Sequence, residues 1–133
     1  MALADGTGLP LAVSIASASP HEVTLLEPLL KERFLRQLPR RIIGDRAYDS
    51  DRLDERLRKR RIELIARHRS NRTRPATQDG RTMRRYKRRW KIERLFSWLQ
   101  NYRRICVRWD LASANYLGFI MLGCIMLLLR RLL

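Results

Sequence analysis

Short apolar runs that favour strands alternate with helical patterns in the first half of the chain, and this alternation constrains the fold most. The runs cover residues 11–17, the segment RRIIGD ending at Asp45, and residues 62–66. Helical patterns lie between them, from Ser19 to about Phe34 and over residues 49–61. Strands separated by helices predict an α/β fold with a short mixed or mainly parallel sheet and flanking helices.

The second half of the chain is expected to be a basic loop followed by helices. Residues 67–80 are polar and contain proline and glycine, which predicts a loop. Residues 81–133 carry a long helix around Glu93 and a closing apolar helix over residues 112–129. Its uninterrupted apolar part is shorter than the roughly 20 residues of a membrane span. We therefore expect a buried core helix and no membrane association, with an exposed dimer face as the alternative.

These units predict a single domain over residues 1–133. Residues 1–66 hold the strand-and-helix units with Asp45, residues 67–80 the basic loop, and residues 81–133 the C-terminal helices with Glu93. Cys106 and Cys124 lie in apolar surroundings without a CxxC motif, as in reduced core cysteines of a cytosolic protein.

The charge of the chain is strongly unbalanced. It contains 29 Lys and Arg residues against 13 Asp and Glu residues, a formal net charge of +16, and no basic residue precedes Lys31. Such a field indicates a polyanionic partner, with nucleic acid as the first candidate. Arginine outnumbers lysine, and its planar guanidinium suits bidentate contacts to phosphate.

Two acids stand out against this basic background. On a helical wheel Glu93 shares an arc of roughly 60° with Tyr86, Arg89 and Gln100. Asp45 follows a predicted strand, at the sheet edge where ligands bind in open α/β folds. Two carboxylates near arginines suit a hard divalent cation at a phosphodiester. Charge pattern alone leaves a solvated salt bridge equally open for Glu93, and a turn-capping role for Asp45 is the simpler interpretation of its position.

Both acids lie in segments that resemble a known family. The spacing Tyr86-x2-Arg89-x3-Glu93, followed by RLFSWLQNYRR, resembles the C-terminal signature of DDE-type insertion-sequence transposases. The segment IIGDRAYDS resembles the part of that family with its second catalytic aspartate, which assigns this role to Asp45 and the glutamate role to Glu93.

The resemblance implies an RNase H-like fold and phosphoryl transfer with two Mg²⁺ or Mn²⁺ ions, held in part by Asp45 and Glu93. The DNA partners would be transposon ends and target, and the location the cytoplasm, at the nucleoid. The candidate DNA-binding residues share a basic or polar character and lie near the signature: Tyr86, Arg85, Arg88, Arg89, Gln100, Arg103 and Arg104.

Two departures from the family pattern indicate an incomplete catalytic domain. The family's leading aspartate lies on a strand upstream of the matching segment, and Asp5 in the sequence DGTG is interpreted as a turn residue. Gln100 occupies a place where the family often has lysine. The expected fold is thus partial, lacking its leading strand, and an upstream transposase half or a homodimer would be the protein partner. The alternatives are a non-catalytic basic DNA-binding remnant and, more weakly, a membrane-surface protein.

Overall fold

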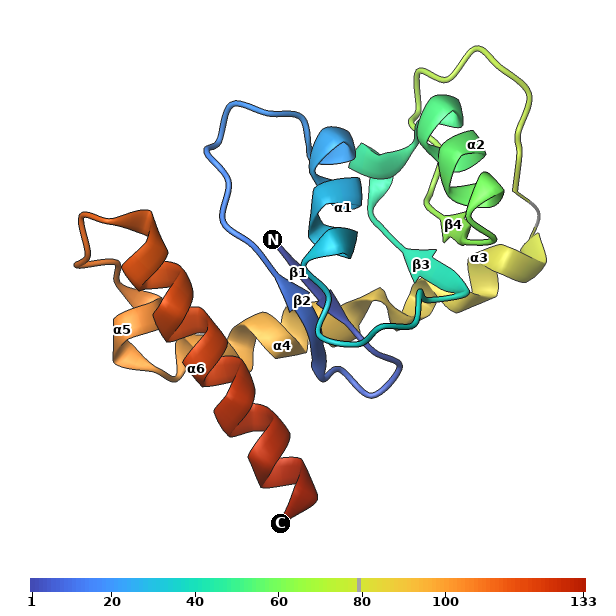
Figure 1. Cartoon of the computed structure of the whole chain (residues 1–133). Helices are drawn as coiled ribbons and strands as arrows, with labels where there is room; N and C mark the ends of the chain where they lie inside the picture. Colours follow the sequence, from blue (N-terminus) through green and yellow to red (C-terminus); the bar gives the residue numbers. More distant parts are fainter. Residues whose placement is uncertain (79) are drawn as a thin grey trace.

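Four short strands form two separate sheets in the computed structural model, which describes residues 1–78 and 80–133, and all side chains there except those of residues 80–82 and 132 (Figure 1). Strand β1 (Ala2–Ala4) pairs antiparallel with β2 (Pro10–Val13). Strand β3 (Arg41–Ile43) pairs parallel with β4 (Glu63–Ile65). The chain is therefore a mixed α/β protein, as the alternation predicts, although its described strands do not join into one sheet.

The turn between β1 and β2 is held by Asp5. Its Oδ1 accepts hydrogen bonds from the Thr7 amide at 2.7 Å, the Thr7 hydroxyl at 2.7 Å and the Leu9 amide at 2.9 Å. Partial burial alone would raise the pKa of the Asp5 carboxyl, but these bonds and one from the Gly8 amide hold it below its usual value. The expectation that Asp5 is a turn residue is confirmed by these contacts.

The same turn is fastened to the helix that carries Glu93. Lys91 and Arg94 donate hydrogen bonds to the backbone carbonyls of Gly6 and Thr7. Gly8 has a φ of +89°, a backbone conformation that favours glycine because other residues adopt it only with strain. The β1–β2 hairpin and the helix above it are thereby locked together.

Two helices and one 3₁₀ turn accompany β3 and β4. Helix α1 (Glu22–Lys31) starts later than the predicted Ser19, and Pro28 lies inside it. The 3₁₀ turn η1 (Arg46–Tyr48) follows β3 directly. Helix α2 (Asp51–Lys59) is capped by Ser50, whose hydroxyl accepts from the Leu53 amide at 3.4 Å.

The C-terminal part of the chain consists of three consecutive helical segments around Glu93, called the helical rod below, followed by two further helices. The predicted long helix around Glu93 is divided into α3 (Gly80–Tyr86), the 3₁₀ turn η2 (Lys87–Arg89) and α4 (Trp90–Gln100). A short α5 (Arg103–Cys106) then leads to α6 (Ser113–Leu132). Figure 1 shows α6 extending away from the rest of the molecule toward the C-terminus.

Each sheet has a hydrophobic core of its own. The first core joins α1, β3, α2 and β4 through Leu26, Leu30, Ile42, Leu53, Leu57, Ile62 and Leu64. The second joins β2 to α4, α5 and α6 through Val13, Leu95, Leu99, Ile105, Cys124 and Leu127. The C-terminal helices thus support the β1–β2 sheet, while α1 packs on the β3–β4 sheet and also contacts β2.

The closing helix corrects the prediction of a buried core helix. Only a narrow stripe of α6 is buried against α5 and β2, while Leu122, Ile125, Met126 and Leu129 are between 40% and 54% exposed. By length and composition, Ser113–Arg131 is the one helical stretch of the described chain that could cross a membrane. An apolar run indicates the surface available for burial, whereas the burial itself depends on neighbours that this chain supplies on one side only. Cys106 is likewise exposed, contrary to expectation, and Cys124 is buried.

Candidate active site

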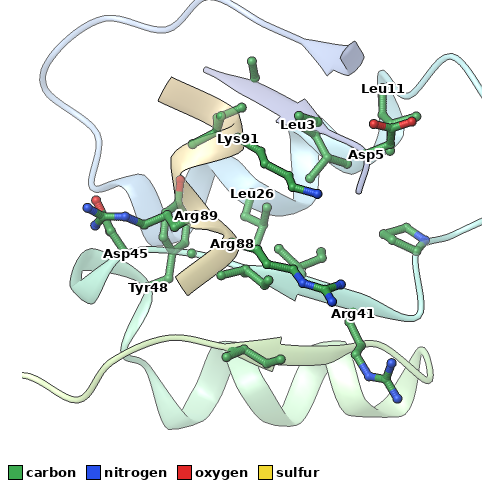
Figure 2. A pocket seen from close by; sticks show the side chains of 18 of the residues that line it. Leu3, Asp5, Leu11, Leu26, Arg41, Asp45, Tyr48, Arg88, Arg89 and Lys91 are labelled. Carbon is green, nitrogen blue, oxygen red and sulfur yellow. The ribbon is translucent and has the colours of Figure 1, made fainter. Parts of the chain in front are cut away.

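A cavity of about 670 Å³ lies between β1 and β3 and contains both predicted acids in its lining (Figure 2). Asp45 enters at the end of β3 and Glu93 from α4. Basic side chains from the helical rod complete this wall, namely those of Arg85, Arg88, Arg89 and Lys91. Asp45 and Glu93, which were predicted to share a site, thus both line this cavity, and their catalytic role stays a prediction.

Asp45 is oriented by its own backbone neighbourhood. It is the N-cap of η1, and its Oδ1 accepts from the Ala47 amide at 2.8 Å. This capping role is what the position after a strand predicts. No other hydrogen bond to the Asp45 carboxylate is made by the described residues, so most of its acceptor capacity is available to a ligand. Figure 2 shows Asp45 and Arg89 at the same end of the cavity.

Glu93 belongs to a short chain of polar contacts along the rod. Arg89 Nη2 donates to Glu93 Oε1 at 3.3 Å, and Arg89 Nη1 donates to the Tyr86 hydroxyl at 3.2 Å. The Arg89 guanidinium also lies 5.5 Å from the centre of the Tyr86 ring. The Tyr–Arg–Glu spacing of the sequence therefore places these three residues together, even though η2 interrupts the α-helix.

Three of the predicted DNA-binding residues lie elsewhere. Gln100 is exposed at the end of α4, and Arg103 and Arg104 are exposed on α5. None of them lines the cavity, and Figure 1 shows α5 far along the rod from β3. Their role as DNA contacts stays a prediction. Gln100 lies outside the Glu93 site because it is nearly two helical turns further along α4.

The acids of the cavity could serve as part of a metal site. Among the described residues, no cluster of three or more His, Cys, Asp or Glu side chains is positioned to hold a metal ion. A divalent cation of the Mg²⁺ type uses one or two protein carboxylates and completes its octahedron with water and phosphate oxygens. Asp45 and Glu93 fit this donor set in chemical type, and Arg89 offers a nearby group for phosphate.

A second polar cluster was missed by sequence reasoning. His68 Nδ1 lies 2.9 Å from Asp49 Oδ1. Arg72 Nη1 donates to Asp49 at 3.0 Å, and Arg72 Nη2 donates to Asp51 at 2.8 Å. These bonds fix the basic loop to the start of α2. The acid-rich segment DSD before that helix was the available signal, but its partners lie about 20 residues away.

Comparison with known proteins bears directly on this site. Residues 1–129 match the family described as "Transposase DDE domain". The chain belongs to this family. The DDE transposase match includes both Asp45 and Glu93, and it confirms the resemblance that their segments indicated.

Two relatives support the assignment. The chain is 36% identical over 129 residues to a Burkholderia cepacia protein named as a transposase for insertion sequence element IS402. That alignment covers 90% of this chain and 57% of the relative, so the chain spans just over half of that protein. It is 32% identical over 131 residues to a Brucella ovis protein named as a transposase for insertion sequence element IS6501, covering 97% and 95% of the two chains. No solved structure matches the chain.

Proposed function

We propose that this chain supplies two of the acids of an RNase H-like transposase catalytic domain and acts in DNA transposition. The reaction would be metal-dependent cleavage and joining of strands at transposon ends. The observation that carries the proposal is the cavity that Asp45 and Glu93 line together, next to the arginines of the helical rod. Family membership supports the reaction class, and the net charge of +16 supports DNA as the substrate.

Each residue has a distinct task in this proposal. Asp45 and Glu93 would hold Mg²⁺ or Mn²⁺, which would supply activation of a water or 3′-hydroxyl and charge stabilisation of the leaving oxygen. Arg89 pairs with Glu93 at 3.3 Å and lies within reach of a phosphate at the same site. Tyr86 orients Arg89 through its hydroxyl. Arg85 and Arg88 bind the DNA backbone along the same wall.

The site needs a further contribution to become a full dinuclear centre. Two carboxylates give weaker metal binding than three, because each anionic oxygen ligand adds attraction for the cation. We assign the remaining acid to an upstream transposase segment, with a second copy of this chain as the other candidate. The complex would act in the cytoplasm, on DNA of the nucleoid.

The first experiment measures nicking of supercoiled plasmid in Mn²⁺, with the chain alone and with the upstream segment of its element added. We expect nicking by the complex. Asp45→Asn and Glu93→Gln should each reduce the nicking rate by more than roughly 100-fold, because the loss of a residue that only supports a metal ligand already costs roughly 10- to 100-fold. Glu55→Gln is the matched control, because Glu55 is an exposed acid of α2 paired with Lys59 at 3.3 Å. Equal activity in all variants would refute the assignment.

A second measurement does not depend on activity. Mn²⁺ bound at the cavity should broaden the nuclear magnetic resonance signals of residues next to Asp45 and Glu93 in the chain alone. The broadening should weaken in Asp45→Asn and persist in Glu55→Gln. Signals that broaden instead around Asp49 and Asp51 would place the cation at the wrong acids.

The excess of arginine also favours a second candidate, a non-catalytic DNA-binding protein. It predicts binding that falls steeply with salt and tolerates any sequence, with no nicking in Mg²⁺ or Mn²⁺. Under this alternative Glu93→Gln leaves DNA affinity unchanged or higher, because it removes a negative charge. Nicking that is lost in the same variant would decide for the transposase.

A further inference from the structure

We propose that two arginines of the basic loop, Arg67 and Arg69, position the two acids of the cavity. Arg69 acts on Asp45, and Arg67 acts on Glu93. The loop begins at the end of β4 and returns to the chain at α3 (Figure 1). Both arginines lie outside the described lining of the cavity and act through intermediate groups. They are therefore positioning residues for the reaction of the proposed function, on which this inference rests.

Arg69 holds the peptide group that orients Asp45. Its Nε donates to Arg46 O at 3.3 Å, and its Nη2 donates to Ala47 O at 3.1 Å. Arg46 O and the Ala47 N–H belong to the same peptide group, and this N–H is the donor to Asp45 Oδ1 at 2.8 Å. Because a peptide group is planar, a bond that fixes its oxygen also fixes the direction of its N–H. Arg69 therefore sets the orientation of the Asp45 carboxylate.

The positive charge of Arg69 adds to this effect. A hydrogen bond from an ionised donor is roughly twice as strong as one between neutral groups. Hydrogen bonds that follow one another through a polar group also polarise and strengthen each other. The guanidinium, the Arg46–Ala47 peptide group and the Asp45 carboxylate form such a series. We expect a neutral side chain in place of Arg69 to hold the peptide group less firmly.

Arg67 supports the Glu93 side of the cavity through Tyr86. Its guanidinium carbon lies 5.5 Å from the centre of the Tyr86 ring, and the guanidinium carbon of Arg89 lies at the same distance from this ring. The Tyr86 hydroxyl accepts from Arg89 Nη1 at 3.2 Å, and Arg89 Nη2 donates to Glu93 Oε1 at 3.3 Å. A cation is attracted to the face of an aromatic ring, and this attraction restricts the ring. Arg67 thus steadies the ring that holds Arg89 beside Glu93.

The backbone on both sides of Arg67 is fastened to the rest of the molecule. Before it, Ala66 N donates to Gln78 Oε1 at 3.2 Å. After it, His68 Nδ1 lies 2.9 Å from Asp49 Oδ1, and Arg69 N donates to Asp49 Oδ2 at 2.7 Å. Because this backbone is already ordered, the two arginine side chains hold their partners at a lower cost in conformational entropy.

The segment 67–69 thereby connects the two elements that carry the acids. Strand β3, which Asp45 follows, belongs to the hydrophobic core with α1 and α2, whereas α4, which carries Glu93, belongs to the other core. A site with two metal ions requires its ligands to be held at fixed distances, since the ions lie about 3.5–4 Å apart. The two arginines supply a polar connection between the cores next to both acids.

A purely structural role of the loop is the alternative, and Arg74 provides the matched control. Arg74 lies in the same loop and donates to Asp51 Oδ2 at 3.1 Å, at the start of α2. None of its described contacts reaches Asp45, Glu93 or the groups that orient them. Arg74→Ala therefore removes the same charge and one attachment of the loop, but leaves the supports of both acids in place.

The first test measures hydrogen exchange of the Ala47 amide in the full chain, without metal or DNA. Arg69→Ala should accelerate this exchange roughly 2- to 12-fold, which is the effect of losing one hydrogen bond. Arg69→Lys keeps a cationic donor and should give an intermediate rate, and Arg74→Ala should exchange like the wild type. Equal rates in Arg69→Ala and the wild type would overturn the role of Arg69. Should Arg69→Ala fail to fold, Arg69→Lys makes the same comparison.

The second test titrates Mn²⁺ and follows the broadening of resonance signals next to Asp45. Arg69→Ala should raise the Mn²⁺ concentration for half of the broadening roughly 10- to 100-fold, as the loss of a group that orients a metal ligand does. Arg74→Ala should leave this concentration unchanged. A shift of the same size in both variants would assign the effect to net charge or to the loop as a whole, and would contradict the proposal.

Arg67 is tested at the signals next to Glu93 in the same titration. Arg67→Met keeps an apolar side chain but removes the cation, and should raise the Mn²⁺ concentration for half of the broadening roughly 2- to 5-fold. Arg67→Lys keeps a cation for the Tyr86 ring and should restore the wild-type value. Identical titrations of these two variants would refute the role of Arg67.

Nicking of plasmid by the complex separates this inference from the proposed function. Arg69→Ala should recover activity at high Mn²⁺, whereas Asp45→Asn should not, because only the second change removes a ligand. Nicking that is lost in Asp45→Asn but is unchanged in Arg69→Ala at every Mn²⁺ concentration would overturn the positioning role and keep the function. No nicking by the wild-type complex, with the Ala47 exchange and the Mn²⁺ titration changed as expected, would refute the function and keep the positioning role.

Discussion

Two pairs of acids, Asp45 with Glu93 and Asp49 with Asp51, differ in the number of hydrogen-bond donors that surround them. Asp49 is only 7% exposed and receives bonds from three partners: His68 at 2.9 Å, the Arg69 amide at 2.7 Å and Arg72 at 3.0 Å. Asp45 accepts one backbone N–H, and Glu93 is 64% exposed with a single contact to Arg89 at 3.3 Å. Asp49 thus has three donors and its neighbour Asp51 has two, from Arg72 and Arg74, while the cavity pair keeps most of its acceptor capacity.

The pKa shifts follow this division. Partial burial would raise the pKa of Asp49, but the hydrogen bonds from Arg69 and His68 and the charge of Arg72 outweigh it and lower the pKa. Hydrogen bonds from Arg72 and Arg74 likewise lower the pKa of Asp51. Since the Thr77 amide donates to His68 Nε2 at 3.2 Å, His68 Nδ1 carries the proton and donates to Asp49. Asp49 and Asp51 use their carboxylate oxygens to stabilise the fold. Asp45 and Glu93 keep carboxylate oxygens without donors among the described residues, and such oxygens are suited to bind a cation.

The largest difference in stability is expected between the variants Asp49→Asn and Asp45→Asn. Asp49→Asn should lower the free energy of unfolding by about 1–3 kcal/mol, because donors of a buried cluster lose a charged acceptor. Asp45→Asn should change it by less than about 1 kcal/mol, because asparagine caps a helical turn as well as aspartate does. Thermal unfolding followed by circular dichroism measures both, and equal losses would abolish the distinction.

The stability of the protein should also depend on pH through the cluster around Asp49 and Asp51. The folded-state pKa values of Asp49 and Asp51 lie below the ordinary aspartate value of 3.8, so the unfolded chain binds protons more readily. Their stabilisation is complete above about pH 5 and is lost as the pH falls through 3.8 toward the folded-state values. The melting temperature should therefore fall over this range, and it should fall less in Asp49→Asn. Parallel curves for the two proteins would show that other carboxylates dominate.

The smallest effect is expected at Glu93. Glu93→Gln should alter the free energy of unfolding by no more than about 0.5 kcal/mol, because exposed ion pairs contribute little. Denaturant titration at low and moderate salt gives the comparison. A loss like that of Asp49→Asn would mean that Glu93 is needed by the fold, and its loss of function could no longer be assigned to metal binding.

The sequence was informative where the determinants are local. The hairpin turn at Asp5, the strand before Asp45 and the shared side of Tyr86, Arg89 and Glu93 follow from turn residues, apolar runs and helical spacing. The predicted strand over residues 11–17 is shorter in the structure, ending at Val13. Gln100 was placed with Glu93 by periodicity, but a helical wheel ignores distance along the axis.

Non-local determinants were beyond sequence reasoning. The division into two sheets depends on which strands find a neighbour, and no local pattern encodes this. The attachment of the basic loop uses Arg72 and its partners more than 20 residues away. The exposure of α6 depends equally on the helices and strands available to cover it.

The bonds from Lys91 and Arg94 to the turn after β1 have a mechanical consequence. They join the Glu93 helix and the hairpin into one unit, while Asp45 lies at the end of β3 in the other sheet. A change in the spacing of the two sheets would therefore change the distance between Glu93 and Asp45 across the cavity.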